Sequence, residues 1–276
     1  MKRLVALYRS PTYSPQQHRQ NDTAILDETV ESLVRRGWAV NKTSESAVGA
    51  GHLPPADLYV NMCQGVAASE RLLRLVPLEA LAVNPPTSVL NCHRHRLVER
   101  MADAGLPFPR TLILPTSEPQ AAALIVHLLN GDGRPVWVKR GDVHAETRAD
   151  VVAAKEATVV AAIADFARRG IARVALQAHV PGPILKFYAV ADGSFFHWYP
   201  ADGAQAAVAD VNEARLRELV FAAARALALE VFGGDVAVPH RDAPVLIDIN
   251  DWPSFAAVRS QAAEAIASYI AKKVTQ

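Results

Sequence analysis

The chain has 276 residues, half of them hydrophobic and 21% charged, with a formal net charge of +1 at pH 7. This is the composition of an ordinary globular protein that needs no disulfides to fold, and the near-neutral charge argues against general binding to nucleic acid or membranes. Two cysteines, Cys63 and Cys92, lack the spacing of a metal site or a redox pair. They predict reduced, partly buried thiols in a cytoplasmic protein.

Residues 1–88 have the pattern of a small α/β domain with a parallel sheet. Apolar runs and amphipathic runs follow one another in the order strand, helix, strand, strand, helix, strand. The expected strands are 3–8, 38–41, 56–62 and 81–84, and the expected helices are 22–36 and 69–75. The first apolar run is broken by Arg9, so it is too short for a signal peptide or a membrane span.

A polar segment at 10–21 separates the first strand from the first helix and contains Pro11 and Pro15. Loops of this length are often functional, and ligands of parallel sheets bind at the carboxyl ends of the strands. We therefore expect the substrate cleft to face the 10–21 loop. Polar residues at the strand ends 61–64 and 84–87 fit the same interpretation, although turn chemistry is the slightly stronger explanation for any one of them.

Residues 89–276 predict a second unit of mixed helices and strands. Gly105 and Gly170 end two of its helices, and a turn precedes a strand that ends in Lys139. The expected helices are 91–104, 119–129, 151–169, 213–229 and 255–273, and the expected strands include 135–139, 183–190 and 194–200.

A hairpin near the end of the chain carries a cluster of oxygen-bearing side chains. Asp235 lies in one extended run, and Asp248 and Asn250 lie in the next, beyond a turn at 239–244. Residues two apart on a strand share a face, so Asp248 and Asn250 point the same way and Asp235 can face them. Carboxylate and amide oxygens suit Mg²⁺ that is carried with substrate phosphates. A surface hairpin with solvated carboxylates is the alternative.

The hairpin resembles the metal-binding end of the ATP-grasp superfamily, whose members carry an acidic residue on one strand and Glu/Asp-x-Asn on the next. Other segments resemble the same superfamily in the same order, over roughly residues 85–260. They are the helix start at Arg94, the run Gly105-Leu-Pro-Phe-Pro-Arg-Thr, Lys139 at a strand end, the segment 177–180, and Lys186. The resemblance implies an α/β protein, α+β in its C-terminal lobes: an ATP-grasp fold preceded by a small parallel-sheet domain. Its domains would be 1–88 and 89–276, the second with a small lobe at about 110–180 and a C-terminal lobe at about 181–276.

The resemblance also implies a nucleotide site. ATP would bind with Mg²⁺ or Mn²⁺ on Asp235, Asp248 and Asn250, and Lys139 would hold the α and β phosphates. The backbone of a hinge segment would hold the adenine edge, and this segment consists of Gln177, Ala178, His179 and Val180.

Three cationic or titratable side chains would lie near the transferred phosphate. Lys186 takes the place of a family Lys or Arg, and Arg94 stands where the family has Lys, at a helix start whose free N–H groups would favour an anion. A solvated basic helix start is the alternative for Arg94. His144, in a short loop that is poorer in glycine than the family's lid, would touch phosphate or substrate, and an exposed loop residue is its alternative.

Three functions remain open. The chain resembles ATP-grasp ligases such as the ribosomal-protein glutamate ligases, which activate a carboxylate as an acylphosphate for capture by an amine. The Asp-Ile-Asn triplet ending at Asn250 is more similar to inositol polyphosphate kinases, which phosphorylate an alcohol. The Arg94 and Ala178 departures and the short loop favour a third reading, a non-catalytic module that keeps the nucleotide-binding fold. The expected partner is a small-molecule or peptide substrate, without nucleic acid or membrane, and a homo-oligomer is left open.

Overall fold

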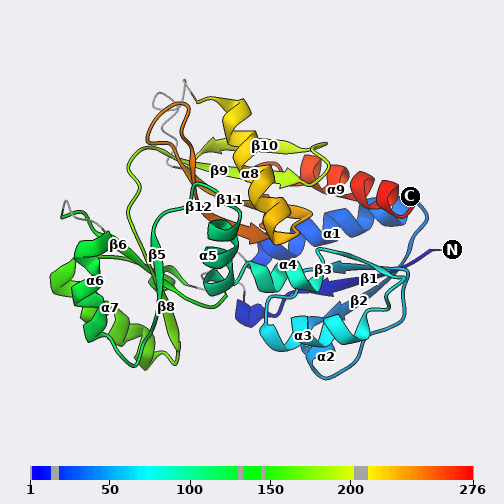
Figure 1. The fold of residues 1–276 in the computed structure, drawn as a ribbon. Helices are drawn as coiled ribbons and strands as arrows, with labels where there is room; N and C mark the ends of the chain where they lie inside the picture. The colour runs from blue at the N-terminus through cyan, green and yellow to red at the C-terminus, as the bar shows by residue number, and fades with distance from the viewer. Residues whose placement is uncertain (1, 14–18, 130–132, 144–146, 202–210, 276) are drawn as a thin grey trace.

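The structure is a computed structural model that describes residues 2–13, 19–129, 133–143, 147–201 and 211–275. Within these residues the strands form three sheets of four strands each, one parallel and two antiparallel (Figure 1). The parallel sheet comes first in the chain, so the predicted α/β class with α+β C-terminal lobes is confirmed. Among the described helices, none has the length and apolar run that crossing a bilayer requires.

The first sheet has the strand order β2-β1-β3-β4. Its strands are β1 (Arg3–Tyr8), β2 (Ala39–Ser44), β3 (Leu58–Asn61) and β4 (Leu81–Val83), and its helices are α1 (Arg19–Arg35), α2 (Glu45–Gly49) and α3 (Val66–Leu75). Strand β1 is apolar at every central position because both of its faces are covered. Leu4 and Ala6 pack in the core that contains α1, whereas Val5 and Leu7 pack in the core that contains α2 and α3. Helix α1 begins before the predicted position 22, and α2 was not predicted.

The second sheet has the order β5-β8-β6-β7 and is antiparallel. It follows α4 (Pro86–Asn91) and α5 (Arg94–Asp103), and consists of β5 (Thr111–Pro115), β6 (Val136–Arg140), β7 (Val151–Ala154) and β8 (Arg173–Gln177), with helices α6 (Gln120–Leu129) and α7 (Glu156–Arg168). Val136 and Val138 pack with both helices in one core. Trp137 and Lys139 alternate with them, so they face the other side of the sheet.

Two helix predictions in this region were wrong in part. The expected helix 91–104 corresponds to α5, which begins three residues later at Arg94, and the short helix α4 before it was not predicted. The expected helix 151–169 begins with a strand. Residues 151–154 pair with β6, with Val151 opposite Lys139 and Ala154 opposite Val136. Valine and alanine occur both in buried strands and on the apolar face of a helix. The local pattern at 151–154 therefore did not distinguish a strand from a first helical turn.

The third sheet has the order β10-β9-β11-β12 and is also antiparallel. Its elements are β9 (Ile184–Val190), β10 (Phe196–Pro200), α8 (Glu213–Leu227), β11 (Val231–Ala237), β12 (Val245–Asp251) and α9 (Arg259–Lys273). Leu185 and Phe187 pack under α8, whereas Tyr188 and Val190 lie in the core shared by α1 and α9. Figure 1 shows α9, in red, lying along α1, in blue. The last helix therefore joins the third sheet to the first.

Both cysteines are free thiols in the interior, with Cys63 0% and Cys92 6% exposed. The prediction of unpaired thiols is confirmed, and they are more deeply buried than expected. Burial raises the pKa of each thiol well above its ordinary value, so neither is a ready thiolate nucleophile.

Candidate active site

The predicted oxygen cluster lies on adjacent strands of the third sheet. Asp235 on β11 is directly opposite Asp248 on β12, and Asn250 is opposite Gly233. Side chains of directly opposed residues lie on the same face of a sheet. All three predicted metal ligands line one cavity of about 440 Å³. The structure thus brings together the three groups that the sequence placed on a hairpin.

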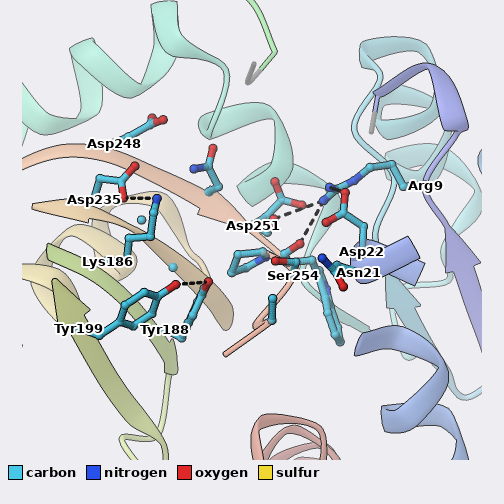
Figure 2. A pocket seen from close by; sticks show the side chains of 16 residues that line it. Arg9, Asn21, Asp22, Lys186, Tyr188, Tyr199, Asp235, Asp248, Asp251 and Ser254 are labelled. Carbon is cyan, nitrogen blue, oxygen red and sulfur yellow. Dashed lines mark hydrogen bonds and ion pairs between the residues drawn. The ribbon is translucent and has the colours of Figure 1, made fainter. Parts of the chain in front are cut away.

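Each carboxylate of this cluster has a cationic partner. Lys186 on β9 is opposite Asp235 and donates to its Oδ1 at 2.8 Å (Figure 2). Arg94 donates to Asp248 Oδ2 at 3.0 Å. Although burial disfavours its charge, the Asp235 carboxylate leaves the pKa of Lys186 raised above its ordinary value. The cluster therefore holds its charges as close ion pairs.

A second cavity, of about 280 Å³, lies between the second and third sheets. It is lined by Trp137, Lys139 and Val151 of the second sheet, by the segment Gln177, Ala178, His179 and Val180, and by Gly182, Ile184, Asp235, Ile247 and Asp248. The predicted phosphate-binding lysine and the whole predicted hinge segment therefore meet in one hollow. Asp235 and Asp248 belong to both cavities, so the carboxylates stand where the two cavities adjoin.

Lys139 is 6% exposed and donates to the Ile247 carbonyl at 3.3 Å. Burial lowers its pKa to about 8, while the nearby Asp248 carboxylate acts in the opposite direction. Among its described contacts, Lys139 has no carboxylate at hydrogen-bonding distance. An anion that enters the cavity therefore stabilises the charged form of this buried lysine.

The donor set fits a magnesium ion that arrives with phosphates. Within the described residues no three His, Cys, Asp or Glu side chains gather into a metal-binding group. The hairpin supplies two carboxylates and one amide oxygen, which is fewer than the six oxygens of an octahedral Mg²⁺ shell. Phosphate and water oxygens complete such shells in nucleotide enzymes, so Asp235, Asp248 and Asn250 suit a shared rather than a fully caged ion.

The start of helix α5 does not offer the anion site that the sequence predicted. The backbone N–H groups of Arg94 and His95 donate to the carbonyls of Asp142 at 2.9 Å and Gly141 at 3.1 Å. The Arg94 guanidinium is turned to Asp248 and to two further carbonyls, and it lines neither of the two cavities formed by the described residues. The expectation of free N–H groups here was wrong, because the loop after β6 caps the helix.

The larger cavity reaches the N-terminal part of the chain, as predicted for the substrate cleft. Arg9, Asn21 and Asp22 border it at the two described ends of the 10–21 loop. Arg9 donates to Asp22 at 3.3 Å and to the carbonyls of Asp251 and Trp252 at 3.4 and 3.2 Å (Figure 2). One wall of the cavity is thereby tied to β12, the strand that carries Asp248 and Asn250.

Two tyrosines of this cavity were not predicted as site residues. Tyr188 follows Lys186 by two positions on β9, and Tyr199 is opposite Lys186 on β10. Their hydroxyl groups lie 3.2 Å apart (Figure 2). Alternation along β9 was the available signal, because it places Tyr188 on the same face as Lys186. His144 lies outside the described residues.

The other polar strand ends have structural contacts. Gln64 donates to the Asp251 carboxylate at 2.7 Å, and Asn61 donates to the Asn84 carbonyl at 3.2 Å. The Asn84 side chain bonds the backbone of residues 230 and 231 at the start of β11. These side chains join the first sheet to the third, so of the three predicted strand ends only the first, at Arg9, lines the cavity among the described residues.

A small parallel α/β unit followed by two antiparallel sheets with a cavity between them is the arrangement of the ATP-grasp fold, and likeness to solved structures shows that the chain has this fold. The RimK domain ATP-grasp protein of Sphaerobacter thermophilus superposes with a TM-score of 0.69 at 17% identity, covering 98% of this chain and 99% of the other. The D-alanyl-alanine synthetase A of Vibrio cholerae gives a TM-score of 0.71 at 11% identity, covering 99% and 97%. The VanG D-Ala:D-Ser ligase of Enterococcus faecalis gives 0.69 at 12% identity, covering 97% and 99%. No family model matches the chain, and no curated protein matches it either.

Proposed function

We propose that the protein is an ATP- and Mg²⁺-dependent ligase of the ATP-grasp type, which activates a carboxylate as an acylphosphate for capture by an amine or another nucleophile. The observation that carries this proposal is the pair of cavities that adjoin at Asp235 and Asp248. A phosphoryl transfer needs a donor and an acceptor on either side of one charged centre, and this geometry provides that arrangement.

In this proposal the smaller cavity takes the nucleotide. The segment from Gln177 to Val180 lies against the adenine, and Lys139 binds phosphate oxygens. The Ala178 N–H donates to the Arg110 carbonyl at 2.8 Å, so other backbone groups of the segment serve the base. Asp235, Asp248 and Asn250 hold Mg²⁺, which when bound neutralises the charge that develops on the transferred phosphoryl group. Support comes from a D-alanine–D-alanine ligase of Bacillus anthracis, solved with ATP, that shares this fold with a TM-score of 0.65.

The larger cavity takes the acceptor, a small molecule or the end of a peptide. In this proposal residues 1–88 form one wall through Arg9, and the lobes at 110–180 and 181–276 enclose the nucleotide. Lys186 orients the attacking carboxylate and the phosphoryl group toward each other, while the Tyr188 and Tyr199 hydroxyls supply neutral hydrogen bonds. Catalysis then consists of positioning and electrostatic stabilisation, without a covalent intermediate on the protein.

The charges of the acceptor cavity favour a ligase over a polyphosphate kinase. Among the described residues that line it, Arg9 and Lys186 are the cationic ones, and each is already paired with a carboxylate, Asp22 or Asp235. A highly phosphorylated alcohol requires several cations that are not neutralised by the protein. The cavity instead suits an acceptor with few negative charges.

The test combines ADP release with trapping of the activated carboxylate. The protein is incubated with ATP, Mg²⁺, hydroxylamine and each of a panel of small carboxylic acids. A hydroxamate formed in proportion to ADP supports the ligase. ADP with a phosphate ester and without hydroxamate supports the kinase, and a titration in which ATP does not bind with or without Mg²⁺ supports the non-catalytic module.

A further inference from the structure

Arg94 is the first residue of α5 and is held almost entirely inside the protein. Its side chain is 6% exposed and its guanidinium makes three hydrogen bonds. Nη2 donates to Asp248 Oδ2 at 3.0 Å, and Nη1 donates to the carbonyls of Arg140 at 3.3 Å and Val143 at 3.4 Å. One side chain thus joins a metal-cluster carboxylate to the segment that follows Lys139.

The backbone of the same helix start holds the rest of that segment. The Arg94 N–H donates to the Asp142 carbonyl and the His95 N–H to the Gly141 carbonyl. Four consecutive carbonyls, from residue 140 to residue 143, therefore accept hydrogen bonds from residues 94 and 95. Because this segment begins at Arg140, the last residue of strand β6 and the neighbour of Lys139, its path fixes the end of that strand.

The chemistry of this position requires a guanidinium. Arginine presents N–H donors in a planar fork, so a single side chain can bond a carboxylate on one side and two carbonyls on the other. A lysine ammonium is one compact donor group on a flexible stem and does not span these three acceptors. A phosphate contact is the competing role, but Arg94 lines neither the larger nor the smaller cavity of the site, and its described hydrogen bonds end on protein oxygens.

We propose that Arg94 is a positioning residue: it holds Asp248 and the segment 140–143 in one fixed relation, so that the metal-binding carboxylate and Lys139 face the nucleotide cavity together. This inference rests on the proposed function of the site. It differs from the phosphate-binding role that the sequence predicted for Arg94, because the residue acts through Asp248 and the backbone rather than on the nucleotide.

The test uses the full-length variants Arg94→Lys and Arg94→Met, with Arg100→Lys and Arg100→Met as matched controls on the exposed face of the same helix. Binding of a non-hydrolysable ATP analogue is measured by calorimetry in EDTA and again with Mg²⁺. The two Arg94 variants are expected to show the same metal-free affinity as each other, because each loses the hydrogen bonds that hold the segment after Lys139. Both are also expected to lose about tenfold or more of the gain that Mg²⁺ provides, which is the usual effect of removing a group that orients a metal ligand. The Arg100 variants are expected to match the wild type in both conditions.

A second measurement does not depend on nucleotide. Hydrogen exchange of the peptide that covers residues 140–143 is followed in the nucleotide-free proteins, and it is expected to become faster in both Arg94 variants but not in the Arg100 variants. Unchanged exchange overturns the inference. So does a metal-free affinity that falls in Arg94→Met and is retained in Arg94→Lys, since that pattern indicates a direct phosphate contact. Failure of the wild type to bind the analogue overturns the proposed function instead, and the exchange comparison still decides the role of Arg94.

Discussion

Replacing Lys139 by methionine should make the protein more stable at neutral pH while removing its nucleotide site. Lys139 is 6% exposed, and burial lowers its pKa from an ordinary value of 10.5 to about 8. The charged lysine is therefore disfavoured in the folded state, and methionine has a similar length without a charge.

The magnitude follows from the two pKa values. The gap between 10.5 and about 8, at about 1.4 kcal/mol per pH unit, corresponds to about 3 kcal/mol. Methionine also removes the hydrogen bond to the Ile247 carbonyl, which contributes about 1 kcal/mol. The net gain in the free energy of unfolding is thus expected to be about 2 kcal/mol below pH 8.

The pH dependence gives the sharper test. Below pH 8 both states carry the proton and the full penalty is present. Between pH 8 and 10.5 the unfolded chain binds more protons than the folded protein, so the stability of the wild type rises with pH. The extra stability of Lys139→Met should therefore decrease between pH 8 and 10.5. Above pH 10.5 the variant should be less stable than the wild type by about 1 kcal/mol, because only the missing hydrogen bond still separates the two proteins.

The assay is urea unfolding of the wild type, Lys139→Met and the exposed control Lys155→Met at pH 6, 7.5, 9 and 10.5. Other groups titrate alike in the proteins, so the difference between them isolates Lys139. A variant that is less stable than the wild type at pH 7.5, or a difference that does not change with pH, would refute the reasoning. Loss of nucleotide binding in the stabilised variant would show a functional site that is maintained at the expense of stability.

Three further predictions concern the hairpin and its attachment. Asp248→Asn should remove the effect of Mg²⁺ on nucleotide affinity and turnover while the fold persists, since an amide oxygen can still accept from Arg94; ATP consumption at the wild-type rate would contradict the metal role. Asn84→Ala should lower the free energy of unfolding by about 3 kcal/mol, because the side chain is 0% exposed and satisfies three backbone groups of residues 230 and 231, at the start of β11. If urea unfolding shows that the free energy of unfolding falls by less than about 1 kcal/mol, these three hydrogen bonds do not have the expected effect. Gly234→Ala should prevent normal pairing of β11 and β12, since a Cβ would lie 2.1 Å from the Asp248 carbonyl, whereas Gly49→Ala meets nothing within 4 Å; equal melting temperatures of the two variants would be the contrary result.

The sequence predicted the hairpin because its signals are local. Alternation along β12 places Asp248 and Asn250 on one face, and the turn at 239–244 brings β11 back beside it. The run of Leu4 to Leu7 likewise predicted a buried strand without knowledge of its partners. Pairings of this kind depend on residues close in the chain, so pattern alone determines them.

The sequence analysis failed where contacts between residues far apart in the chain determine the structure. Residues 151–154 became a strand because β6 was available to pair with them, and the apolar sequence alone did not distinguish this from a first helical turn. The positioning role that we propose for Arg94 was not foreseen either, because its partner Asp248 is 154 positions away and no local pattern links the two residues. Tyr199 was missed because its place in the cavity follows from the register of β10 against β9.

The proposed acceptor and nucleotide walls of the site differ in how they are attached to the hairpin that carries Asp235 and Asp248. On the acceptor side, Gln64, Asn84 and Asp251 are at most 1% exposed, and their hydrogen bonds to the hairpin region are 2.7–2.8 Å long. On the nucleotide side, the described side-chain bonds from the second sheet to the hairpin are Lys139 and Gln177 to the Ile247 carbonyl, at 3.3 and 3.4 Å. Short, buried hydrogen bonds open together with the global fold, whereas long ones at a cavity wall open at lower free energy. The acceptor wall is therefore the rigid reference of the site. The second sheet is the part that can adjust to a bound nucleotide, except at residues 140–143, which Arg94 holds to Asp248.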